Sequence, residues 1–226
     1  MERTPRRVIC WDLDRTLISP EEPGRGRFIP NLQPLVEALI ARRIQNVITT
    51  ASTGGHAELV LGSSGMKPLF GPIFELEDIC DERKNKNYLP VAKALRIPGE
   101  EATHRMLVVG DRMEDAAADL DLTFILHRMS EQCTADVYAI ILHELMELSD
   151  SWSDAHAIMQ LIARESYCLD GEFEGVLYSR AGIMLAVGSS LADRSPLAPL
   201  NRLIEVRTVP HFLKIEDRLI QPERFR

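Results

Sequence analysis

Two aspartates, Asp12 and Asp14, close an apolar run near the start of the chain and are the first residues whose spacing could support chemistry. Residues 8–17 read V-I-C-W-D-L-D-R-T-L. Side chains alternate along a strand, so Asp12 and Asp14 would leave on one side and Leu13 on the other. One carboxylate could attack phosphorus while the other handles a proton, which divides phosphate-ester hydrolysis into two easier steps. A strand that ends in polar turn residues would give the same pattern.

A second apolar segment also ends in acidic residues. Residues 106–115 read M-L-V-V-G-D-R-M-E-D, which places Asp111 and Asp115 four positions apart. This spacing lets both side chains face one place across a loop and a first helical turn. Grouped carboxylate oxygens suit Mg²⁺, which proteins hold through one or two carboxylates together with water and substrate phosphate. The alternative is that Glu114 and Asp115 only stabilise a helix N-terminus through its dipole.

Hydroxyl groups and lysines lie between these two acidic segments. Residues 44–52 read I-Q-N-V-I-T-T-A-S and predict a short strand that ends in hydroxyls before a helix. Thr50 could hold a phosphate oxygen with its hydroxyl and with nearby backbone N–H groups such as that of Ala51. Lys84 and Lys86 stand just before a helical pattern, where a positive charge opposes the helix dipole. Neutralising phosphate charge would explain a lysine there, although a solvated surface lysine is the ordinary alternative.

These four elements, in this order, resemble the motifs of the haloacid dehalogenase superfamily of phosphohydrolases over residues 8–148. The matching segments are D-L-D-R-T from residue 12, T-A-S from residue 50, a lysine at 86 with 84 as the rival, and G-D-R-M-E-D from residue 110. The resemblance implies that Asp12 is a nucleophile and that Asp14 is a general acid and then a general base.

The resemblance also implies a ligand set. Phosphate contacts would come from Thr50, Ala51 and Lys86, and Mg²⁺ would be held by Asp111 and Asp115 with the Asp12 carboxylate and the Asp14 main-chain carbonyl. Arg15 departs from the family pattern, because a small or amide residue is more usual there. Its side chain would contact phosphate or substrate, or point to solvent.

The function expected from this resemblance is a Mg²⁺-dependent phosphatase that hydrolyses a phosphate monoester through an aspartyl-phosphate. One alternative is a non-catalytic or receiver-like phosphoacceptor or regulatory domain, and another is a phosphotransferase that uses the same aspartate. In the receiver-like case the lysine should follow the last acidic cluster, whereas Lys86 precedes Asp111. The expected partner is a phosphorylated substrate, small or macromolecular, and a homodimer is also compatible with the sequence.

Composition limits the other classes of function. The 226 residues carry a formal net charge of −8, which argues against broad electrostatic binding of nucleic acid. No apolar signal-peptide core precedes residue 8, and the apolar segment 137–148 is interrupted by His143 and two glutamates. A cytoplasmic location without membrane contact is therefore expected. The histidines are scattered, and His56, near the T-A-S segment, is interpreted as a helix-start or surface residue.

The hydrophobic pattern alternates between strands and helices and predicts an α/β fold, a doubly wound parallel sheet with a Rossmann-like core. Only a Pro- and Gly-rich loop at residues 19–28 separates the first motif from the first helix, and residues 66–83 hold no extra domain. No large inserted cap is therefore expected, and the site should be open. Strands are expected at residues 44–49, 70–76, 106–109 and 123–126, the last closing the sheet. Helices are expected at residues 31–43 with Asn31 as N-cap, from 55 to about 62 or 65, and at 87–96, 114–120 and 137–148.

A change of composition near residue 149 suggests two parts, a core at residues 1–149 and a small α+β extension at 150–226 whose role is unknown. In the extension a helix is expected at 156–165, a hairpin from 172–178 and 183–187, and short strands at 203–206 and 212–215. It carries no recognisable motif. We expect it to pack beside the core and to supply substrate contacts or a dimer surface, the alternative being that it only extends the hydrophobic core.

Overall fold

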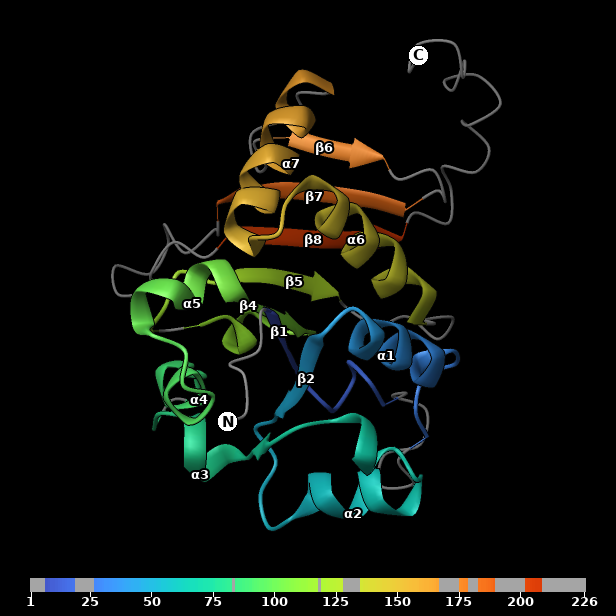
Figure 1. Ribbon diagram of the computed structural model, residues 1–226, viewed down its shortest axis with the longest axis vertical. Helices are drawn as coiled ribbons and strands as arrows, with labels where there is room; N and C mark the ends of the chain where they lie inside the picture. The colour runs from blue at the N-terminus through green and yellow to red at the C-terminus, as the bar shows by residue number, and fades with distance from the viewer. Residues whose placement is uncertain are drawn as a thin grey trace.

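An eight-stranded β-sheet forms the centre of the protein, and helices cover both of its faces (Figure 1). The computed structural model describes residues 7–18, 27–82, 84–117, 119–127, 135–166, 175–178, 183–189 and 202–208. The strands are β1 Arg7–Trp11, β2 Ile44–Thr49, β3 Ile73–Phe74, β4 Met106–Gly110, β5 Thr123–His127, β6 Gly175–Tyr178, β7 Ile183–Ser189 and β8 Arg202–Thr208. Their order in the sheet is β3-β2-β1-β4-β5-β8-β7-β6, and every neighbouring pair from β3 to β8 is parallel. This parallel region confirms the predicted α/β fold with a Rossmann-like core, and it includes one strand, β8, from beyond the predicted core.

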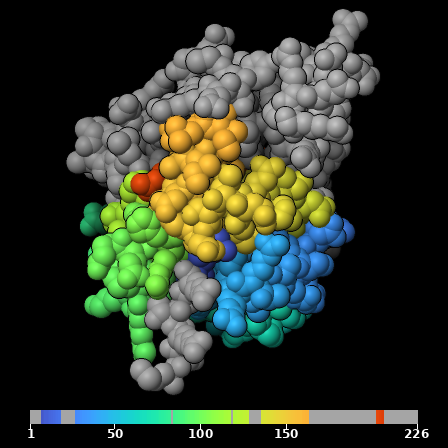
Figure 2. All heavy atoms as spheres, turned by 45° about the horizontal axis from the view of Figure 1, so that its top comes forward, coloured from blue at the N-terminus to red at the C-terminus, as the bar shows by residue number. Residues whose placement is uncertain are grey.

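The helices alternate with the parallel strands. They are α1 Leu32–Ala41, α2 His56–Ser63, α3 Leu76–Ile79, α4 Leu89–Ala94, α5 Gly99–Arg105, α6 Ala135–Leu148 and α7 Trp152–Ser166, with short 3-10 helices η1 Lys67–Leu69 and η2 Met113–Asp115. In Figure 2, α6 packs between α7 and α1. Among the described residues, no helix is both long enough and apolar enough to cross a membrane.

Alternating side chains on β1 divide the core into two layers. Ile9 and Trp11 pack under α1, α2, α6 and α7, whereas Val8 and Cys10 pack under α3, α4 and α5. All four are fully buried, as expected of a central parallel strand. Burying such a side chain contributes roughly 1.5–3 kcal/mol, so a slip in register would be costly. The core therefore fixes the position of Asp12, the residue that follows β1.

The C-terminal section joins the main sheet. β8 pairs in parallel with β5, and Leu203 and Ile204 are buried in opposite layers of the core. The expectation that residues 123–126 close the sheet is wrong, because the sheet continues through β8 into the antiparallel hairpin of β6 and β7. That hairpin was predicted, whereas residues 212–215 lie outside the described residues. These contacts favour the alternative that the section extends the hydrophobic core, and a domain boundary at residue 149 stays a prediction.

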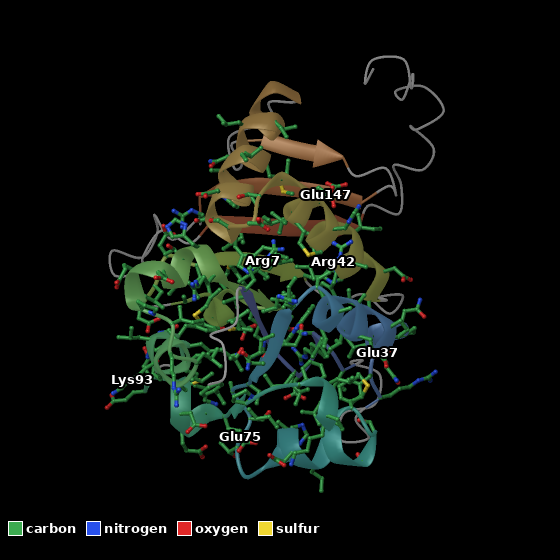
Figure 3. The ribbon with its side chains drawn as sticks, viewed as in Figure 1. Arg7, Glu37, Arg42, Glu75, Lys93 and Glu147 are labelled. Atoms are coloured by element: carbon green, nitrogen blue, oxygen red, sulfur yellow. The ribbon has the colours of Figure 1, made fainter. Side chains whose placement is uncertain are left out.

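Arg7 fastens the start of β1 to the start of α7. Its guanidinium lies 4.8 Å from the centre of the Trp152 ring, and its Nη1 donates to the Ser149 carbonyl at 3.3 Å. Figure 3 shows Arg7 next to Arg42 in this region. Burial lowers the pKa of Arg7, and nearby Asp150 opposes that change. This junction lies at the amino end of β1, so the beginning of α7 is remote from the side chains that follow the carboxyl end.

The prediction of a helix at residues 114–120 is wrong. Among the described residues of this segment, only Met113–Asp115 forms a helical turn, of the 3-10 type, and Ala116 is extended. Contacts with another segment replace the bonds of a helix: the Tyr88 hydroxyl donates to the Asp115 carbonyl at 2.8 Å, and Asp119 accepts the amide of Tyr88 at 2.8 Å. These bonds fix the acidic segment against the residues that follow Lys86.

Asn31 precedes α1, as predicted, but its side chain makes no capping hydrogen bond. Its φ is 64°, a left-handed conformation that asparagine tolerates better than most residues. The side-chain Nδ2 instead donates to Asp136 Oδ2 at 2.9 Å. Asn31 thus joins the beginning of α1 to α6 rather than closing its own helix.

Candidate active site

Three candidate residues follow three neighbouring parallel strands. Asp12 follows β1, Thr50 follows β2 and Asp111 follows β4, and β1 lies between the other two strands. Because the strands are parallel, these residues all stand at the carboxyl edge of the sheet. Open α/β sheets bind ligands outside this edge. The sheet therefore gathers residues that are separated by up to a hundred positions in sequence.

Lys86 is the centre of the hydrogen bonds at this edge. Its Nζ donates to Asp12 Oδ1 at 2.6 Å and to the Thr49 carbonyl at 2.6 Å, and it lies 2.7 Å from Asp115 Oδ1. The residue is 1% exposed, and these three acceptors match the three donors of an ammonium group. Lys84, the rival candidate, is exposed. The structure thus brings Lys86, and not Lys84, to Asp12.

Asp12 is held by both its main chain and its side chain. Its amide donates to the Val109 carbonyl at 2.8 Å, and its Oδ2 accepts the Thr16 hydroxyl at 3.1 Å. Burial raises the pKa of Asp12 to about 7, the Lys86 ammonium opposes this rise, and the Asp115 carboxylate adds to it. These bonds fix the Asp12 carboxyl at the end of β1, and its burial shields it from solvent.

The Asp12, Asp111 and Asp115 carboxylates form a group that fits a divalent cation. Each offers one oxygen, and these oxygens lie within 4.8 Å of one another. Burial and the nearby Asp115 raise the pKa of Asp111, a sign of crowded negative charge. The Lys86 ammonium and the exposed Arg112, whose Nε lies 3.8 Å from Asp111 Oδ2, offset part of this negative charge, and a Mg²⁺ would neutralise the rest. Oxygen donors of this kind are what Mg²⁺ prefers.

Gly110 makes room for the inward turn of Asp115. Asp115 is 6% exposed as a residue, and its Oδ2 accepts the Arg112 amide at 3.1 Å. A Cβ added at Gly110 would lie 2.6 Å from both Cβ and Oδ2 of Asp115. Contacts this short are not tolerated, so the glycine is a steric requirement of the acidic group.

Gly110→Ala is therefore expected to displace Asp115 and to lower the free energy of unfolding by about 1–3 kcal/mol, the usual cost of overpacking. Chemical denaturation of the metal-free protein measures this change. Gly62→Ala is the matched control, because a Cβ at Gly62 would meet nothing within 4 Å and alanine favours helices. Equal stability of the two variants would contradict the steric role of Gly110.

Asp14 lies apart from the buried carboxylates. Its side chain is 51% exposed, its Oδ2 accepts the Ser52 hydroxyl at 2.6 Å, and its Oδ1 lies 3.4 Å from His56 Nε2. Strand β1 ends at Trp11, so the alternation of side chains between the two faces of the sheet does not extend to Asp14, although Leu13 is buried. The Asp14 carboxyl is thus in contact with solvent, where a leaving group or water could reach it. His56 is the first residue of α2, as interpreted from the sequence.

Thr50 is buried, but its own amide is already bonded. That amide donates to the Phe74 carbonyl at 3.0 Å, and the Thr50 hydroxyl oxygen accepts the Ser52 amide at 3.2 Å. The hydroxyl can still donate its proton. Of the groups predicted to bind phosphate in this loop, the Thr50 hydroxyl and the Ala51 amide therefore remain the suitable donors.

Sequence reasoning assigned no role to several groups at this site. They are the Thr16 hydroxyl, the Thr49 carbonyl, Ser52 and His56. Only Thr16 and Ser52 lay inside recognised motifs, whereas a main-chain carbonyl carries no signal in the residue type. Arg15 is exposed with φ 64°, and its positive charge opposes the rise in the pKa of Asp111. Arg15 therefore lies on the Asp111 side of the site.

The chain matches no known family model and no curated protein. It is similar to solved structures of the haloacid dehalogenase superfamily, the family indicated by the motifs. One is a hydrolase of this superfamily from Ehrlichia chaffeensis, with 12% identity and a TM-score of 0.46, covering 63% of this chain and 98% of that chain. Another is a predicted phosphoglycolate phosphatase from Haemophilus somnus, with 19% identity and a TM-score of 0.41, covering 52% of this chain and 56% of that one. A third is a haloacid dehalogenase-like protein from Streptococcus pneumoniae, with 12% identity and a TM-score of 0.42, covering 58% and 89% respectively. At such identities the likeness concerns the fold, and function has to be inferred from the site.

Proposed function

We propose that this protein is a Mg²⁺-dependent phosphatase that hydrolyses a phosphate monoester through an aspartyl-phosphate on Asp12. The observation that carries the proposal is the group of three carboxylates at the carboxyl edge of the sheet, in which the buried Asp12 and Asp115 contact Lys86 and the half-buried Asp111 lies beside them. It combines a fixed nucleophile, a positive charge and oxygen ligands in one place. Such preorganised charge is what phosphoryl transfer requires.

In the first half of the reaction, a carboxylate oxygen of Asp12 forms a bond to phosphorus and the ester P–O bond breaks. Asp14 gives its proton to the departing alkoxide. In the second half, the Asp14 carboxylate takes a proton from water, the water oxygen bonds to phosphorus, and the bond between phosphorus and Asp12 breaks. The products are phosphate and the original Asp12 carboxylate.

The other residues would hold the phosphoryl group. Lys86, which contacts Asp12, offsets negative charge, and the Thr50 hydroxyl and the Ala51 amide donate to phosphate oxygens. When bound, Mg²⁺ would be held by Asp12, Asp111, Asp115 and the Asp14 carbonyl, and would neutralise phosphate charge as a Lewis acid.

The position of Asp14 favours hydrolysis over simple phosphoacceptor behaviour. A domain that only stores a phosphoryl group needs the carboxylates and the lysine, but it needs no acid and base beside them. Here a half-exposed carboxyl, held by Ser52, lies two residues after Asp12. The substrate we propose is a phosphate monoester of a small molecule or macromolecule, and a screen of phosphorylated metabolites, phosphopeptides and phosphorylated oligonucleotides, with and without Mg²⁺, tests the proposal.

Asp111→Ala is expected to weaken Mg²⁺ binding and phosphatase activity together, because it removes one of three grouped oxygen donors. Loss of a metal ligand should lower the affinity by about tenfold or more. Isothermal calorimetry with Mg²⁺ measures the affinity directly. Glu114→Ala is the control, since Glu114 is exposed and close in sequence but outside the carboxylate group. Unchanged Mg²⁺ binding in Asp111→Ala would show that these acids only stabilise the local fold.

Mg²⁺ is expected to raise the melting temperature more at pH 8 than at pH 5. Without metal, the Asp12 pKa is higher in the folded chain, about 7, than the ordinary value of 3.8. The folded state therefore binds more protons between these values, so stability falls as pH rises from about 4 to 7. Mg²⁺ replaces those protons and relieves the repulsion. Melting curves in chelator and in Mg²⁺ at both pH values test this, and an equal rise at the two would contradict it.

A further inference from the structure

Asp14 is the one proposed reacting group at this site that is not fixed by burial. A half-exposed aspartate has several rotamers open to it, and a proton donor must lie within hydrogen-bond reach of the departing oxygen. Something must therefore hold its carboxyl in place. The structure gives it two contacts from the segment that follows β2: Ser52, in the loop before α2, on Oδ2, and His56, the first residue of α2, near Oδ1.

Ser52 is itself fixed on three sides. Its amide donates to the Thr50 hydroxyl oxygen at 3.2 Å, its carbonyl accepts the Leu76 amide at 3.1 Å, and its hydroxyl donates to Asp14 at 2.6 Å. The last distance is short, as expected for a hydroxyl that donates to a carboxylate. Ser52 thus joins the proposed phosphate-binding residue Thr50 to the proposed acid Asp14. Its hydrogen bond with Leu76 also connects it to the beginning of α3.

His56 is positioned by the turn that precedes α2. Gly54 and Gly55 have φ of 69° and 75°, and the Gly55 amide donates to Glu75 Oε2 at 2.9 Å. Glu75, labelled in Figure 3, lies in the segment that follows β3. The turn places His56 Nε2 at 3.4 Å from Asp14 Oδ1. The two carboxylate oxygens of Asp14 are therefore contacted by different residues, which restrains both its position and its rotation.

We infer that Ser52, assisted by His56, is a positioning residue that holds the Asp14 carboxyl where it meets the leaving group. This inference rests on the proposed function, because it assigns Asp14 the role of general acid. It predicts a specific defect. Without Ser52, the chain keeps its nucleophile and phosphate contacts but protonates the departing oxygen less effectively.

The test compares leaving groups. The phenolate of 2,4-dinitrophenyl phosphate leaves without being protonated, whereas the leaving groups of phenyl and alkyl phosphates need a proton from an acid. The quantity to measure is kcat/KM, which for this two-step route reports only the steps up to departure of the alcohol. Ser52→Ala should lower kcat/KM for phenyl phosphate by about tenfold, the usual effect of one charge-assisted hydrogen bond, and for dinitrophenyl phosphate by less than about twofold.

Two further variants sharpen the result. Ser52→Thr keeps the hydroxyl and should restore most of the activity on phenyl phosphate. Thr53→Ala removes an exposed hydroxyl one residue further along the same loop and should behave as wild type on both esters. If Ser52→Ala does not fold, His56→Ala in the same series provides the measurement, with a smaller selective loss expected because its contact is longer.

The outcomes separate the two hypotheses. An equal loss on both esters, or no loss on either, with an active wild type and an inactive Asp12→Asn, would overturn the positioning role while leaving the proposed phosphatase in place. A wild-type chain that hydrolyses neither ester in Mg²⁺ would overturn the proposed function and this inference with it. A loss of activity in Ser52→Ala that is confined to phenyl phosphate, and that Ser52→Thr reverses, would establish the positioning role of Ser52.

Discussion

Asp12→Asn is expected to abolish phosphatase activity, lowering kcat by about 10⁴-fold or more, because an amide is a far weaker nucleophile than a carboxylate. The substitution keeps the size and shape of a buried side chain, so the surrounding fold should persist. Turnover of an aryl phosphate in saturating Mg²⁺ is the measurement. In chelator at pH 8 the variant should be at least as stable as wild type, since it removes a charge that burial disfavours.

Asp14→Asn is the informative companion to this variant. Loss of a proton-transfer group costs about 10²–10⁴-fold, and it should impair the attack of water more than the formation of the aspartyl-phosphate from an ester with a good leaving group. Mass spectrometry of Asp14→Asn quenched during turnover should therefore find phosphate on the peptide that contains Asp12. Phosphate on another residue, or full activity in Asp12→Asn, would contradict the assignment of the nucleophile.

The parallel core could be predicted from sequence because its strands are buried on both faces and read as apolar runs. β2 was predicted with the observed bounds, and β4 and β5 within one residue. The errors lie where tertiary contacts override local preference. Residues 114–120 have a helix-like composition, yet Asp115 and Asp119 in this segment accept hydrogen bonds from Tyr88 instead of forming a helix. The short α5 at Gly99–Arg105 was not predicted either.

The C-terminal strands illustrate a different limit. The pattern of residues 203–206 indicated a strand, but a strand pattern does not name its partner. Only the folded chain shows that β8 lies against β5 and so lengthens the parallel sheet. The choice between a substrate-binding extension and an extension of the core depended on that partner, and the buried Leu203 and Ile204 favour the core.

At the candidate site, residue types and order were enough to place Asp12, Thr50 and Asp111 after strands and to group Asp115 with Asp111, because strand ends are visible in sequence. The chemical roles of these residues stay predictions. They were not enough to choose between Lys84 and Lys86, which share the same local composition. The difference is one of direction: Lys86 lies in a short bridge opposite Cys80 that turns it inward, while Lys84 lies at φ 64° in a turn and is exposed. The contacts of Asp14 with Ser52 and His56 were also beyond sequence reasoning.

Lys86→Met is expected to destabilise the metal-free protein by about 3–5 kcal/mol, the usual result of removing one partner from a buried ion pair. The substitution removes the ammonium that pairs with the buried Asp12 and Asp115, while a methionine keeps the apolar stem packed. Chemical denaturation in chelator at pH 8 measures the change. The variant should also lose phosphatase activity, because no ammonium then offsets the charge of the phosphoryl group.

The cost of Lys86→Met should depend on pH in a definite direction. Without the ammonium, which opposes the rise in the pKa of Asp12, this carboxyl gains a proton still more readily in the folded state than in the unfolded chain, so stability falls as pH rises through the range in which Asp12 loses that proton. The loss of stability should therefore be smaller at pH 5 than at pH 8. Lys84→Met is the matched control, since Lys84 is exposed and two residues away, and it should change stability by no more than about 0.5 kcal/mol. If the two lysine variants prove equally stable at pH 8, Lys86 does not hold the three carboxylates together, and the charge balance on which the metal site and the nucleophile both depend must be assigned to other residues.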